Sequence, residues 1–531
     1  MSHNLKTKSH LYDQIVSLKS APLFSSKIIE TSDAVISLAS PYLNAHRDKN
    51  NDYELATICL TSENEDNQSG LISTLGLDFT FVAYLKQKNI LILSRGPLGR
   101  SKLYFRPDKK GIRLTPKLWA EPEWDEINHN FFFYSIANSL LTAPVECDYL
   151  LETAANHWLR VPRGSIMILD IAGTVLKTSY LNIPIDTDIK NNSTADLESQ
   201  LRDQLDEHLT KIIGNTNFTT EISGGIDSGI ITSRAKRLFP NKFLGGVSVI
   251  SDFYELRREK SFIEDIAKQA DIPLSFINAG EHLPFSDLHN VPIHDEPSLS
   301  SIPWQLVATS LKTARALGAE THIHGIGGDQ VFIPIPEGII ELLTAKPKID
   351  FLNESCRKIV KTQINLVKSR YFNGTKPVFV DRGLLLYDGW ADHYIAPNLN
   401  VRYEAGWIDA NIIRLCEELR NQAPYPNNIF KPLPRNVFAS DLPESVRERP
   451  GKIGFDGIYQ RGLRQNFDTV CSLIEDQNIG LEKFGVKPKN ILREIKNCAR
   501  LGWDGSSNTI LFVISWAAWA NYLYKNNLTL P

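Results

Sequence analysis

Residues 221–228, Glu-Ile-Ser-Gly-Gly-Ile-Asp-Ser, restrict the possible fold more than any other part of this chain. Residues 218–220 before them have strand-like composition, and the residues after them follow a helical pattern. A glycine-rich turn between a strand and a helix points backbone N–H groups and a helix N-terminus at one spot, which favours a bound phosphate. Gly224 and Gly225 would let the backbone approach an anion, and Asp227 could hold Mg²⁺ beside it. The alternative is an ordinary turn, and a Walker-type loop is excluded because no Gly-Lys-Ser/Thr follows.

Strand and helix patterns alternate along the chain after this loop. Such alternation is typical of a parallel sheet covered by helices, with ligands at the carboxyl ends of the strands. From about residue 336 the pattern is mainly helical, and residues up to about 185 look β-rich. The predicted strands are 78–84, 89–94, 165–170, 242–250 and 321–324, and the predicted helices are 261–270, 304–317 and 509–524.

The length of the chain and one polar segment predict the domain organisation. The chain has 531 residues, which is too many for one core. Residues 186–194 are polar and interrupt the pattern, so we expect a linker there and domains over residues 1–190 and 191–531. Ser193 or Thr194 can cap the next helix. Its apolar stripe consists of Leu197, Leu201, Leu205 and Leu209.

Composition excludes several classes of protein. A net charge of −3 gives no electrostatic reason to expect nucleic acid as a partner. No apolar run approaches the length of a membrane span, and the N-terminus has no apolar signal-peptide region. The six cysteines form no Cys-x-x-Cys pair, so we expect neither a disulfide framework nor a zinc site, and we expect a cytoplasmic location.

A second glycine-rich loop lies about a hundred residues further on. Residues 324–332 read His-Gly-Ile-Gly-Gly-Asp-Gln-Val-Phe and again follow a short predicted strand. Two such loops at neighbouring strand ends, each with one carboxylate, could hold one Mg²⁺–triphosphate between them. Mg²⁺ needs few protein carboxylates, because phosphates and waters supply its other ligands. We therefore expect Asp227 and Asp329 to bind the metal, although Asp329 alone is more typical of a turn.

Two further segments carry candidate charges. The stretch 431–435, Lys-Pro-Leu-Pro-Arg, leads to Lys452, which lies in a segment rich in glycine and proline. A lysine held in this way can stabilise pyrophosphate or the attacked carbonyl, whereas a single lysine is more often a solvated surface residue. His294, Asp295 and Glu296 could face the same site. The alternative, which is at least as well supported by the sequence, is that they lie in a surface loop.

The order and spacing of these motifs resemble the synthetase half of the asparagine synthetase superfamily. Residues 223–228 are similar to the pyrophosphate loop of the ATP pyrophosphatases, which cleave ATP to AMP and pyrophosphate. Residues 442–455 are similar to a family stretch that carries the catalytic lysine, which corresponds to Lys452. The resemblance implies ATP and Mg²⁺ as cofactors, with Lys452, Asp227 and Asp329 catalytic. It implies that ATP is bound by Ser223, Gly224, Gly225, Asp227, Ser228, Ser248, His324 and Gly325.

The N-terminal part resembles the glutaminase domain of the same family. Residues 93–105 are similar to one of its conserved stretches, with Gly96 in place of an Asp. The resemblance implies an α/β plus α+β fold: an N-terminal Ntn-glutaminase-like β-sandwich remnant, then a parallel-sheet ATP-pyrophosphatase (adenine nucleotide alpha hydrolase-like) synthetase domain with a helical C-terminal part. A working glutaminase needs Cys directly after the initiator Met. Ser2 follows Met1, so we expect that glutamine hydrolysis is lost and that the nucleophile is an amine of the substrate.

Ile326 narrows the expected reaction. Asparagine synthetases have Glu and β-lactam synthetases have Tyr at this position, and Ile cannot transfer a proton. The Gly-x-Gly-Gly-Asp form resembles that of lasso peptide macrolactam synthetases. That resemblance implies adenylation of an internal Asp or Glu side chain of a linear core peptide, then attack by its N-terminal amine in antibiotic biosynthesis. A leader peptidase or precursor-recognition protein would be the partner. The alternatives are a β-lactam synthetase-like or ammonia-dependent asparagine synthetase-like ligase, or a non-catalytic scaffold.

Overall fold

The structure is a computed structural model in which most of the chain after residue 76 is described. The described residues are 26–30, 34–39, 77–98, 100, 102–108, 111–118, 127–139, 150–181, 192–252, 254–292, 294–333, 348–372, 389–422, 429–451, 456–503 and 508–526. Lys452 and most of the predicted linker, 186–194, lie outside these residues. The domain boundary at residue 190 therefore stays a prediction.

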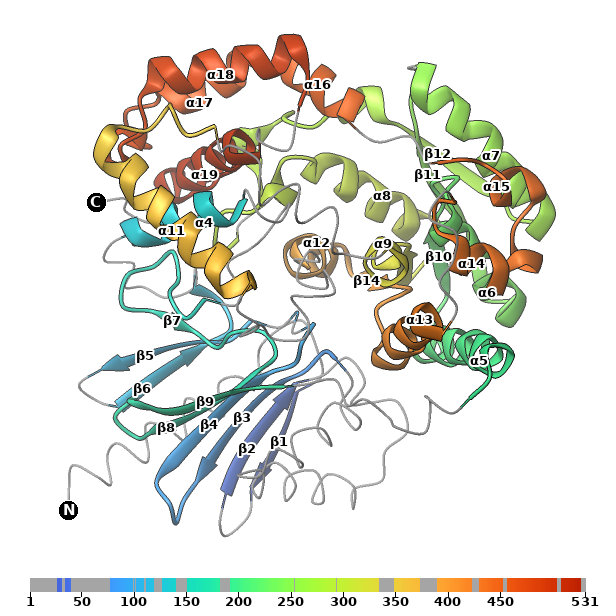
Figure 1. The fold of residues 1–531 in the computed structure, drawn as a ribbon, viewed down its shortest axis with the longest axis horizontal. Coiled ribbons are helices and arrows are strands. Elements are labelled where there is room, and N and C mark those ends of the chain that lie inside the picture. The colour runs from blue at the N-terminus through green and yellow to red at the C-terminus, as the bar shows by residue number, and fades with distance from the viewer. Residues whose placement is uncertain are drawn as a thin grey trace.

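The N-terminal part contains two antiparallel sheets, drawn in blue and blue-green in Figure 1. One is six-stranded, in the order β1-β2-β3-β4-β8-β9, and the other is three-stranded, in the order β6-β5-β7. Their bounds are β1 Ser26–Glu30, β2 Ala34–Ala39, β3 Thr80–Leu85, β4 Ile90–Arg95, β5 Tyr104–Asp108, β6 Gly111–Thr115, β7 Leu159–Arg160, β8 Ser165–Asp170 and β9 Val175–Tyr180.

Alternation along β3 explains how the larger sheet is packed. Val82 and Tyr84 lie in one apolar cluster with Phe105 and Leu114 of the smaller sheet. Phe81 points the other way, into the cluster that also holds the helices around the parallel sheet. Successive side chains of a strand point to opposite faces, so the larger sheet is buried on both faces at β3, whereas its edge strand β9 is mostly exposed. The two sheets thus share one apolar cluster, while the glutaminase-like β-sandwich stays a prediction.

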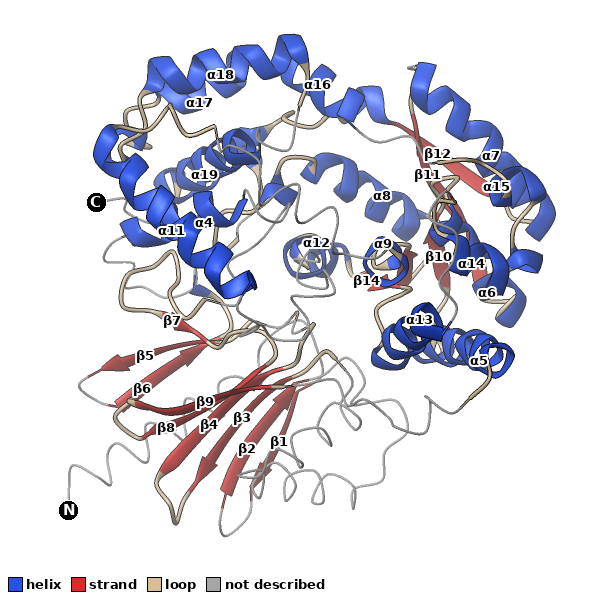
Figure 2. Ribbon diagram, in the orientation of Figure 1, coloured by secondary structure: helices blue, strands red, loops and turns tan. Residues whose placement is uncertain are grey.

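The second half of the molecule contains a five-stranded sheet in the order β12-β11-β10-β13-β14, and every pairing in it is parallel. Its strands are β10 Phe218–Glu221, β11 Phe243–Ile250, β12 Leu274–Asn278, β13 Thr321–His324 and β14 Arg402–Ala405. The prediction of a parallel α/β sheet is confirmed, and Figure 2 shows helices on both of its sides. The prediction of a mainly helical region after residue 336 is confirmed for the described residues, in which β14 is the one strand of that region.

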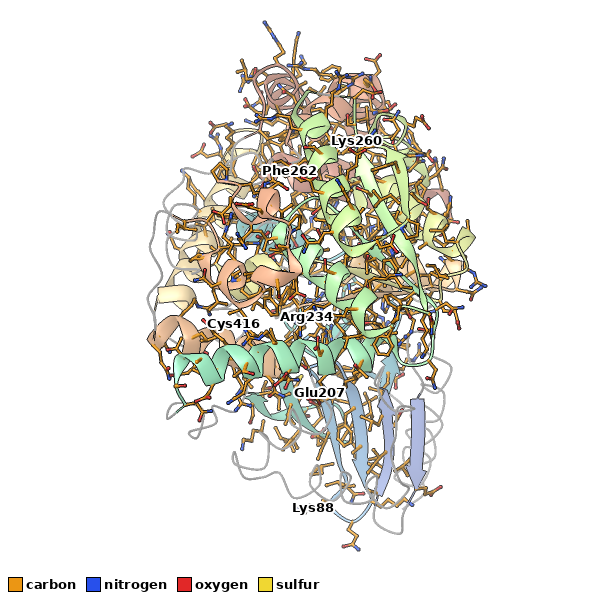
Figure 3. All side chains as sticks on the ribbon, turned by 90° about the vertical axis from the view of Figure 1, so that its right-hand side faces the viewer. Lys88, Glu207, Arg234, Lys260, Phe262 and Cys416 are labelled. Atoms are coloured by element: carbon orange, nitrogen blue, oxygen red, sulfur yellow. The ribbon has the colours of Figure 1, made fainter. Side chains whose placement is uncertain are left out.

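Helices cover this sheet on opposite faces. On one face lie α5 Thr194–Ile213, α6 Ile226–Leu238 and α7 Tyr254–Ala270, and Figure 3 views this layer with Glu207, Arg234 and Lys260 labelled on them. On the other face α8 Trp304–Ala316 packs against β10, β11 and β12. Helix α5 is capped by Ser193, whose Oγ accepts a hydrogen bond from Asp196 N at 3.2 Å, and its predicted leucine stripe is fully buried.

The helices after residue 350 fall into two groups. Helices α13 Ala410–Gln422, α14 Pro432–Val437 and α15 Glu444–Arg447 pack against α5, α6 and α7 beside the parallel sheet. The others share a separate core with a helix from the N-terminal part, and they are α11 Glu354–Phe372, α12 Trp390–Tyr394, α16 Asp456–Gln465, α17 Phe467–Glu475, α18 Pro488–Leu501 and α19 Asn508–Lys525. Helix α4 His129–Ser139 packs against α11 and α19. The ring of Phe132 on α4 meets Trp516 on α19 edge-on at 4.7 Å. Distant parts of the chain therefore share one core.

Buried ion pairs also join the N-terminal sheets to the rest of the molecule. The guanidinium of Arg100 donates to Asp78 at 2.6 Å and to Glu404 of β14 at 3.0 Å, with all three side chains at most 5% exposed. Arg160 donates to both carboxylate oxygens of Glu296. Removing one partner of such a pair leaves an uncompensated buried charge, which costs about 3–5 kcal/mol. Among the described residues, no helix combines the length and the apolar character that a membrane crossing requires.

Candidate functional site

The two glycine-rich loops meet where the strand order of the parallel sheet reverses. From β10 the chain proceeds to β11 and β12 on one side, then returns to β13, which pairs with β10 on the other side. Open parallel sheets bind ligands in the crevice at such a switch point, beyond the carboxyl ends of the strands. The loop after β10 and the loop after β13 both start there.

The first loop is a tight turn into helix α6. Gly224 has φ +73°, and a Cβ on it would lie 3.0 Å from the carbonyl oxygen of Glu259. The Oγ of Ser228 accepts a hydrogen bond from Ser223 N at 3.1 Å and lies 3.0 Å from Ser223 Oγ. Gly225 is the N-cap of α6 and offers no side-chain cap, so the first N–H groups of the helix face the turn. The loop is thus closed by its own serines and open toward an anion.

Arg449 holds this loop from behind. Its guanidinium donates to both carboxylate oxygens of Glu259, at 2.6 and 2.9 Å, and to Gly224 O at 2.8 Å. It also lies 4.2 Å from the ring centroid of Phe262. Paired, planar contacts of this kind fix a guanidinium in one orientation. Arg435 in turn donates to the carbonyl oxygen of Arg449 at 2.6 Å, which ties α14 to the same support.

The second loop packs directly against the first. A Cβ on Gly325 would lie 3.0 Å from Ser228 N, and a Cβ on Gly328 would lie 2.3 Å from Asp227 Cγ. Gly327, with φ +102°, turns the chain into the short helix α9 Gly328–Phe332, which carries Asp329 in its first turn. Glycine is therefore required at Gly328, because any side chain there would displace Asp227.

Lys431 brings the two aspartates together. Its Nζ lies 2.5 Å from Asp227 Oδ2 and also contacts Asp329 Oδ1. The lysine side chain is 3% exposed and that of Asp227 15%, whereas that of Asp329 is 63% exposed. Trp407 Nε1 donates to the carbonyl oxygen of Asp227 at 3.2 Å. Asp227 is thus held in place by buried neighbours, whereas Asp329 contacts the same ammonium group from the solvent-exposed side of the crevice.

This arrangement fits a divalent cation bound together with a triphosphate. The two carboxylates come close enough to share one ammonium group, so one metal ion could bridge them. Among the described residues, no group of three or more His, Cys, Asp or Glu side chains could hold a metal by itself. Mg²⁺ takes one or two carboxylates and completes its shell with substrate phosphates and water. The donor set therefore suits Mg²⁺ delivered with a nucleotide.

Behind the loops lies a buried layer of neutral rings. Burial lowers the pKa of His322 to about 4, and it lowers the pKa of His324 well below its usual value, helped by His322 and Arg100. Burial, with the Glu221 carboxylate next in effect, raises the pKa of Tyr403 well above its usual value. His324 Nδ1 accepts a hydrogen bond from Ile326 N at 3.3 Å. His324 therefore supports the second loop as a neutral ring.

Not all predicted residues lie at this crevice. Ser248 is fully buried, and its Oγ donates to Ile222 O at 2.6 Å, one residue before the first loop. His294, Asp295 and Glu296 are buried, so a surface loop was the wrong expectation for them. The carboxylate of Asp295 accepts from Tyr394 Oη at 2.8 Å, in the interface with the N-terminal sheets. Lys452 falls outside the described residues.

Sequence reasoning did not assign the supporting residues. Lys431 was noticed within its proline-rich stretch, but nothing in the sequence connects it to Asp227. Arg449 and Glu259 look like ordinary surface charges in the sequence, since neither lies in a recognisable motif. Their pairing depends on α15, two residues before Arg449, packing against α7, which only the folded chain brings about.

Comparisons with known proteins agree with the site at the level of the superfamily. Residues 196–369, about a third of the chain, match the asparagine synthase family model. This match supports an ATP-using amide ligase of the asparagine synthetase superfamily, the group in which ATP and generally Mg²⁺ are used. The matched residues include both glycine-rich loops but not Lys431.

The other comparisons add no functional information. No curated protein matches the chain. Among solved structures, a U34-tRNA thiolase, NcsA from Methanococcus maripaludis with its 4Fe-4S cluster, has a TM-score of 0.20 and 13% sequence identity. It covers 42% of this chain and 81% of its own. A similarity of this size carries no conclusion about activity.

Proposed function

We propose that the protein is an ATP-dependent macrolactam synthetase of the kind that closes lasso peptides. It would adenylate the side-chain carboxylate of an internal Asp or Glu in a linear core peptide and join the acyl group to the peptide's N-terminal amine. The observation that carries the adenylation chemistry is the contact of Asp227 and Asp329 with one ammonium group, between two glycine-rich loops. A bound Mg²⁺ would neutralise phosphate charge during pyrophosphate departure.

The reaction divides into two balanced steps. A carboxylate oxygen of the peptide attacks the α-phosphorus of ATP, the bond to the β-phosphate oxygen breaks, and pyrophosphate leaves. The N-terminal amine then attacks the acyl carbon, loses a proton and displaces AMP. In the first step the N–H groups at the start of α6 and the ammonium of Lys431 would stabilise charge on the leaving group. Lys452 would share that role, as the superfamily resemblance implies.

Ile326 favours a peptide over ammonia or a small amine. Its side chain is 42% exposed three residues before Asp329 in the second loop, where a proton-transferring side chain would otherwise lie. Phe430, next to Lys431, is also partly exposed, at 39%. Apolar side chains beside a charged reaction centre suit a substrate with apolar groups flanking its carboxylate. Holding that carboxylate and the amine together can lower the barrier by about 7–11 kcal/mol.

The test is to incubate the protein with ATP, Mg²⁺ and candidate core peptides. Mass spectrometry should detect loss of one water from the peptide, and AMP and pyrophosphate should form in equal amounts. Asp227→Asn and Asp329→Asn should each slow turnover about 10²- to 10³-fold while the fold is kept. Asp203→Asn, an exposed change on α5, is the matched control and should leave the rate unchanged.

Other outcomes would redirect the proposal. AMP formation with aspartate and ammonia, but not with peptides, would indicate the asparagine synthetase-like alternative. A β-lactam product from a small amino acid substrate would indicate the second alternative. Failure to bind MgATP at all would leave a scaffold as the remaining function. A leader peptidase as partner belongs to the proposal and would be examined by co-purification.

A further inference from the structure

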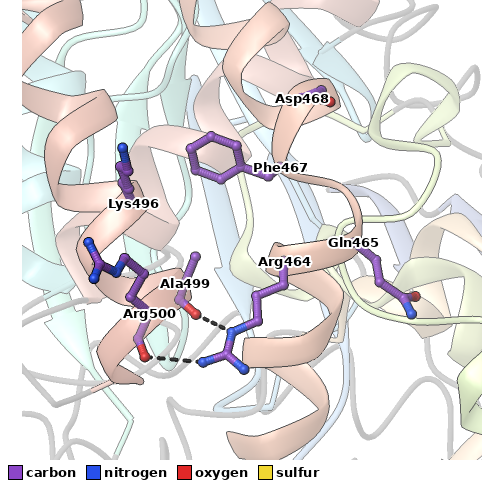
Figure 4. Close-up of a pocket in the computed structure, with 7 residues that line it drawn as sticks. All are labelled: Arg464, Gln465, Phe467, Asp468, Lys496, Ala499 and Arg500. Atoms are coloured by element: carbon purple, nitrogen blue, oxygen red, sulfur yellow. Dashed lines mark hydrogen bonds between the residues drawn. The ribbon is translucent and has the colours of Figure 1, made fainter.

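A pocket that is separate from the candidate ATP site lies among α16, α17 and α18. Its volume is about 620 Å³, and it is open to solvent. Figure 4 shows its lining residues, with Lys496 and Arg500 extending from α18, Phe467 beside them and Arg464 entering from α16. The lining residues are Arg464, Gln465, Phe467, Asp468, Lys496, Ala499 and Arg500.

The junction of α16 and α17 shapes this pocket. Helix α16 ends at Gln465 and α17 begins at Phe467, with Asn466 at φ −106° and ψ 21° between them. Arg464 crosses to the end of α18, where its guanidinium donates to the carbonyl oxygen of Ala499 and, at 3.1 Å, to that of Arg500. A cation at a helix C-terminus is stabilised by the helix dipole, so Arg464 is held in place as one wall of the pocket.

The charge pattern of α18 is unfavourable for the helix itself. Lys496 and Arg500 are four residues apart, so both side chains lie on one face and repel each other. Within the described part of the chain, neither side chain makes an ion pair. Helix α18 carries four basic residues and one acidic residue, although the whole chain has a net charge of −3. Helix α18 is therefore a local concentration of positive charge on a protein whose net charge is negative.

Apolar surface adjoins these cations. Phe467 is half-buried at the pocket, and Leu501, directly after Arg500, is 85% exposed. Leu501 is the most exposed of the large apolar side chains that the structure describes. A built site for a free phosphate would present converging buried donors, whereas Arg464, Lys496 and Arg500 are exposed, with the ring of Phe467 beside Lys496. The surface instead matches a chain that alternates carboxylates with apolar side chains.

We propose that this pocket, with Leu501 at its edge, is a docking site for an acidic peptide segment of a partner protein that also carries an aromatic or aliphatic residue. Carboxylates of that segment pair with Lys496, Arg500 and the exposed edge of Arg464. The apolar residue packs on Phe467 and Leu501. The site is separate from the ATP site, so this docking does not depend on the proposed reaction.

The test measures binding of a fluorescein-labelled peptide, Glu-Glu-Phe-Glu-Glu, to the full-length protein by fluorescence anisotropy. We expect saturable binding that weakens as salt is added, because exposed charges are screened. Peptides Lys-Lys-Phe-Lys-Lys and Glu-Glu-Ser-Glu-Glu should bind at least about tenfold and threefold more weakly, since each lacks one half of the match. Inorganic phosphate should not displace the acidic peptide at comparable concentration.

Variants separate this pocket from general electrostatic attraction. K496E/R500E should weaken binding at least about tenfold, whereas K489E/R493E, with the same charge change on the same helix outside the pocket, should change it less than about twofold. Leu501→Ser, which disturbs no packing, should weaken binding about threefold. None of these changes should alter MgATP binding.

Equal weakening by K496E/R500E and K489E/R493E would overturn the proposal, since it would show only a diffuse basic surface. Displacement by inorganic phosphate would reassign the pocket as a simple anion site. Absence of saturable binding to the unaltered protein would also reject it. A K496E/R500E variant that has also lost MgATP binding is misfolded, and the Leu501→Ser variant then decides. Unchanged peptide binding by folded Leu501→Ser would overturn the proposal.

Discussion

Lys431 places a buried ammonium group between carboxylates that come from two different loops. Its backbone has φ +52°, and Pro432 begins the next helix, α14. The side chain is thus aimed by local backbone geometry, and its charge compensates Asp227 and Asp329. Without it, two carboxylates would face each other in a partly buried crevice, where like charges repel strongly.

We expect Lys431→Met to weaken MgATP binding at least about 100-fold, because the phosphates lose a positioned cation. Isothermal titration calorimetry measures this directly. Lys312→Met, an exposed change on α8, is the control and should bind MgATP as the unaltered protein does. Unchanged affinity in folded Lys431→Met would remove this lysine from the nucleotide site.

At the scale of elements, the second glycine loop and helix α6 act as one unit because of their close approach. A methyl group at Gly328 would meet Asp227 Cγ at 2.3 Å. We expect Gly328→Ala to displace Asp227 and weaken MgATP binding more than about tenfold, with a stability loss of about 1–3 kcal/mol.

The matched control for Gly328→Ala is Gly214→Ala at the end of α5. Gly214 has φ +55° and ψ −127°, and a Cβ there would meet nothing within 4 Å, so alanine costs backbone strain of about 1–3 kcal/mol without touching the loops. Urea unfolding gives both stabilities, and calorimetry gives both affinities. Equal losses of affinity would show that the effect at Gly328 is one of general stability.

Strand β13 makes the stability of the protein sensitive to acid. The pKa of His322 on this strand is lowered to about 4 by burial, as is that of His294 in the interface with the N-terminal sheets. Unfolding returns both pKa values to about 6.5, so between pH 6.5 and 4 the unfolded chain binds protons that the folded protein does not. The free energy of unfolding should therefore fall as the pH drops through this window, by about 3 kcal/mol for each histidine.

Urea unfolding at a series of pH values tests this expectation. The two ring nitrogens of His322 form hydrogen bonds with the hydroxyl groups of Thr219 and Ser310. Glutamine is a suitable replacement because its amide keeps a polar group at this position without an ionisable proton. His322→Gln should make the free energy of unfolding depend less steeply on pH between pH 6.5 and 4. The difference in slope should correspond to about one bound proton fewer than in the unaltered protein. An unchanged slope would mean that the buried ring is not responsible.

How well the sequence predicted an element depended on whether its signal was local. The predicted bounds of β13 and β8, residues 321–324 and 165–170, agree with the structure because apolar alternation and nearby turns mark them. Strand β14 was missed, because its Glu404 looks exposed in the sequence and is buried only by its ion pair with Arg100. Helix α4 was missed because its aromatic run, at residues 131–134, suits a strand equally well.

The residues of the candidate site also divide into those that a local sequence motif marks and those that only long-range packing brings together. The two loops and their aspartates could be found from glycine spacing, since that chemistry is local. Lys431 is 204 residues from Asp227, and the clamp of Arg449 on Glu259 spans 190 residues. Contacts of this range depend on how helices pack over the sheet, which no local pattern encodes.

At the scale of the whole molecule, the N-terminal sheets are joined to the rest by buried charge. We expect Arg160→Met to lower the free energy of unfolding by about 3–5 kcal/mol, because the buried carboxylate of Glu296 loses its cation. The double variant R160M/E296Q should recover part of this loss, since it buries no unpaired charge. Urea unfolding of the single and double variants completes the cycle. Additive losses would contradict a direct pairing.

The packing of α4 against α19 has a consequence for how the chain matures. During synthesis Phe132 is made long before Trp516, its ring partner. The aromatic face of α4 therefore stays without this partner until α19 has been made, and its closure joins distant parts of the chain. Such long-range closure is slow and prone to aggregation. The yield of folded protein should therefore depend on how quickly α19 follows α4 and on chaperones that shield α4 in the meantime.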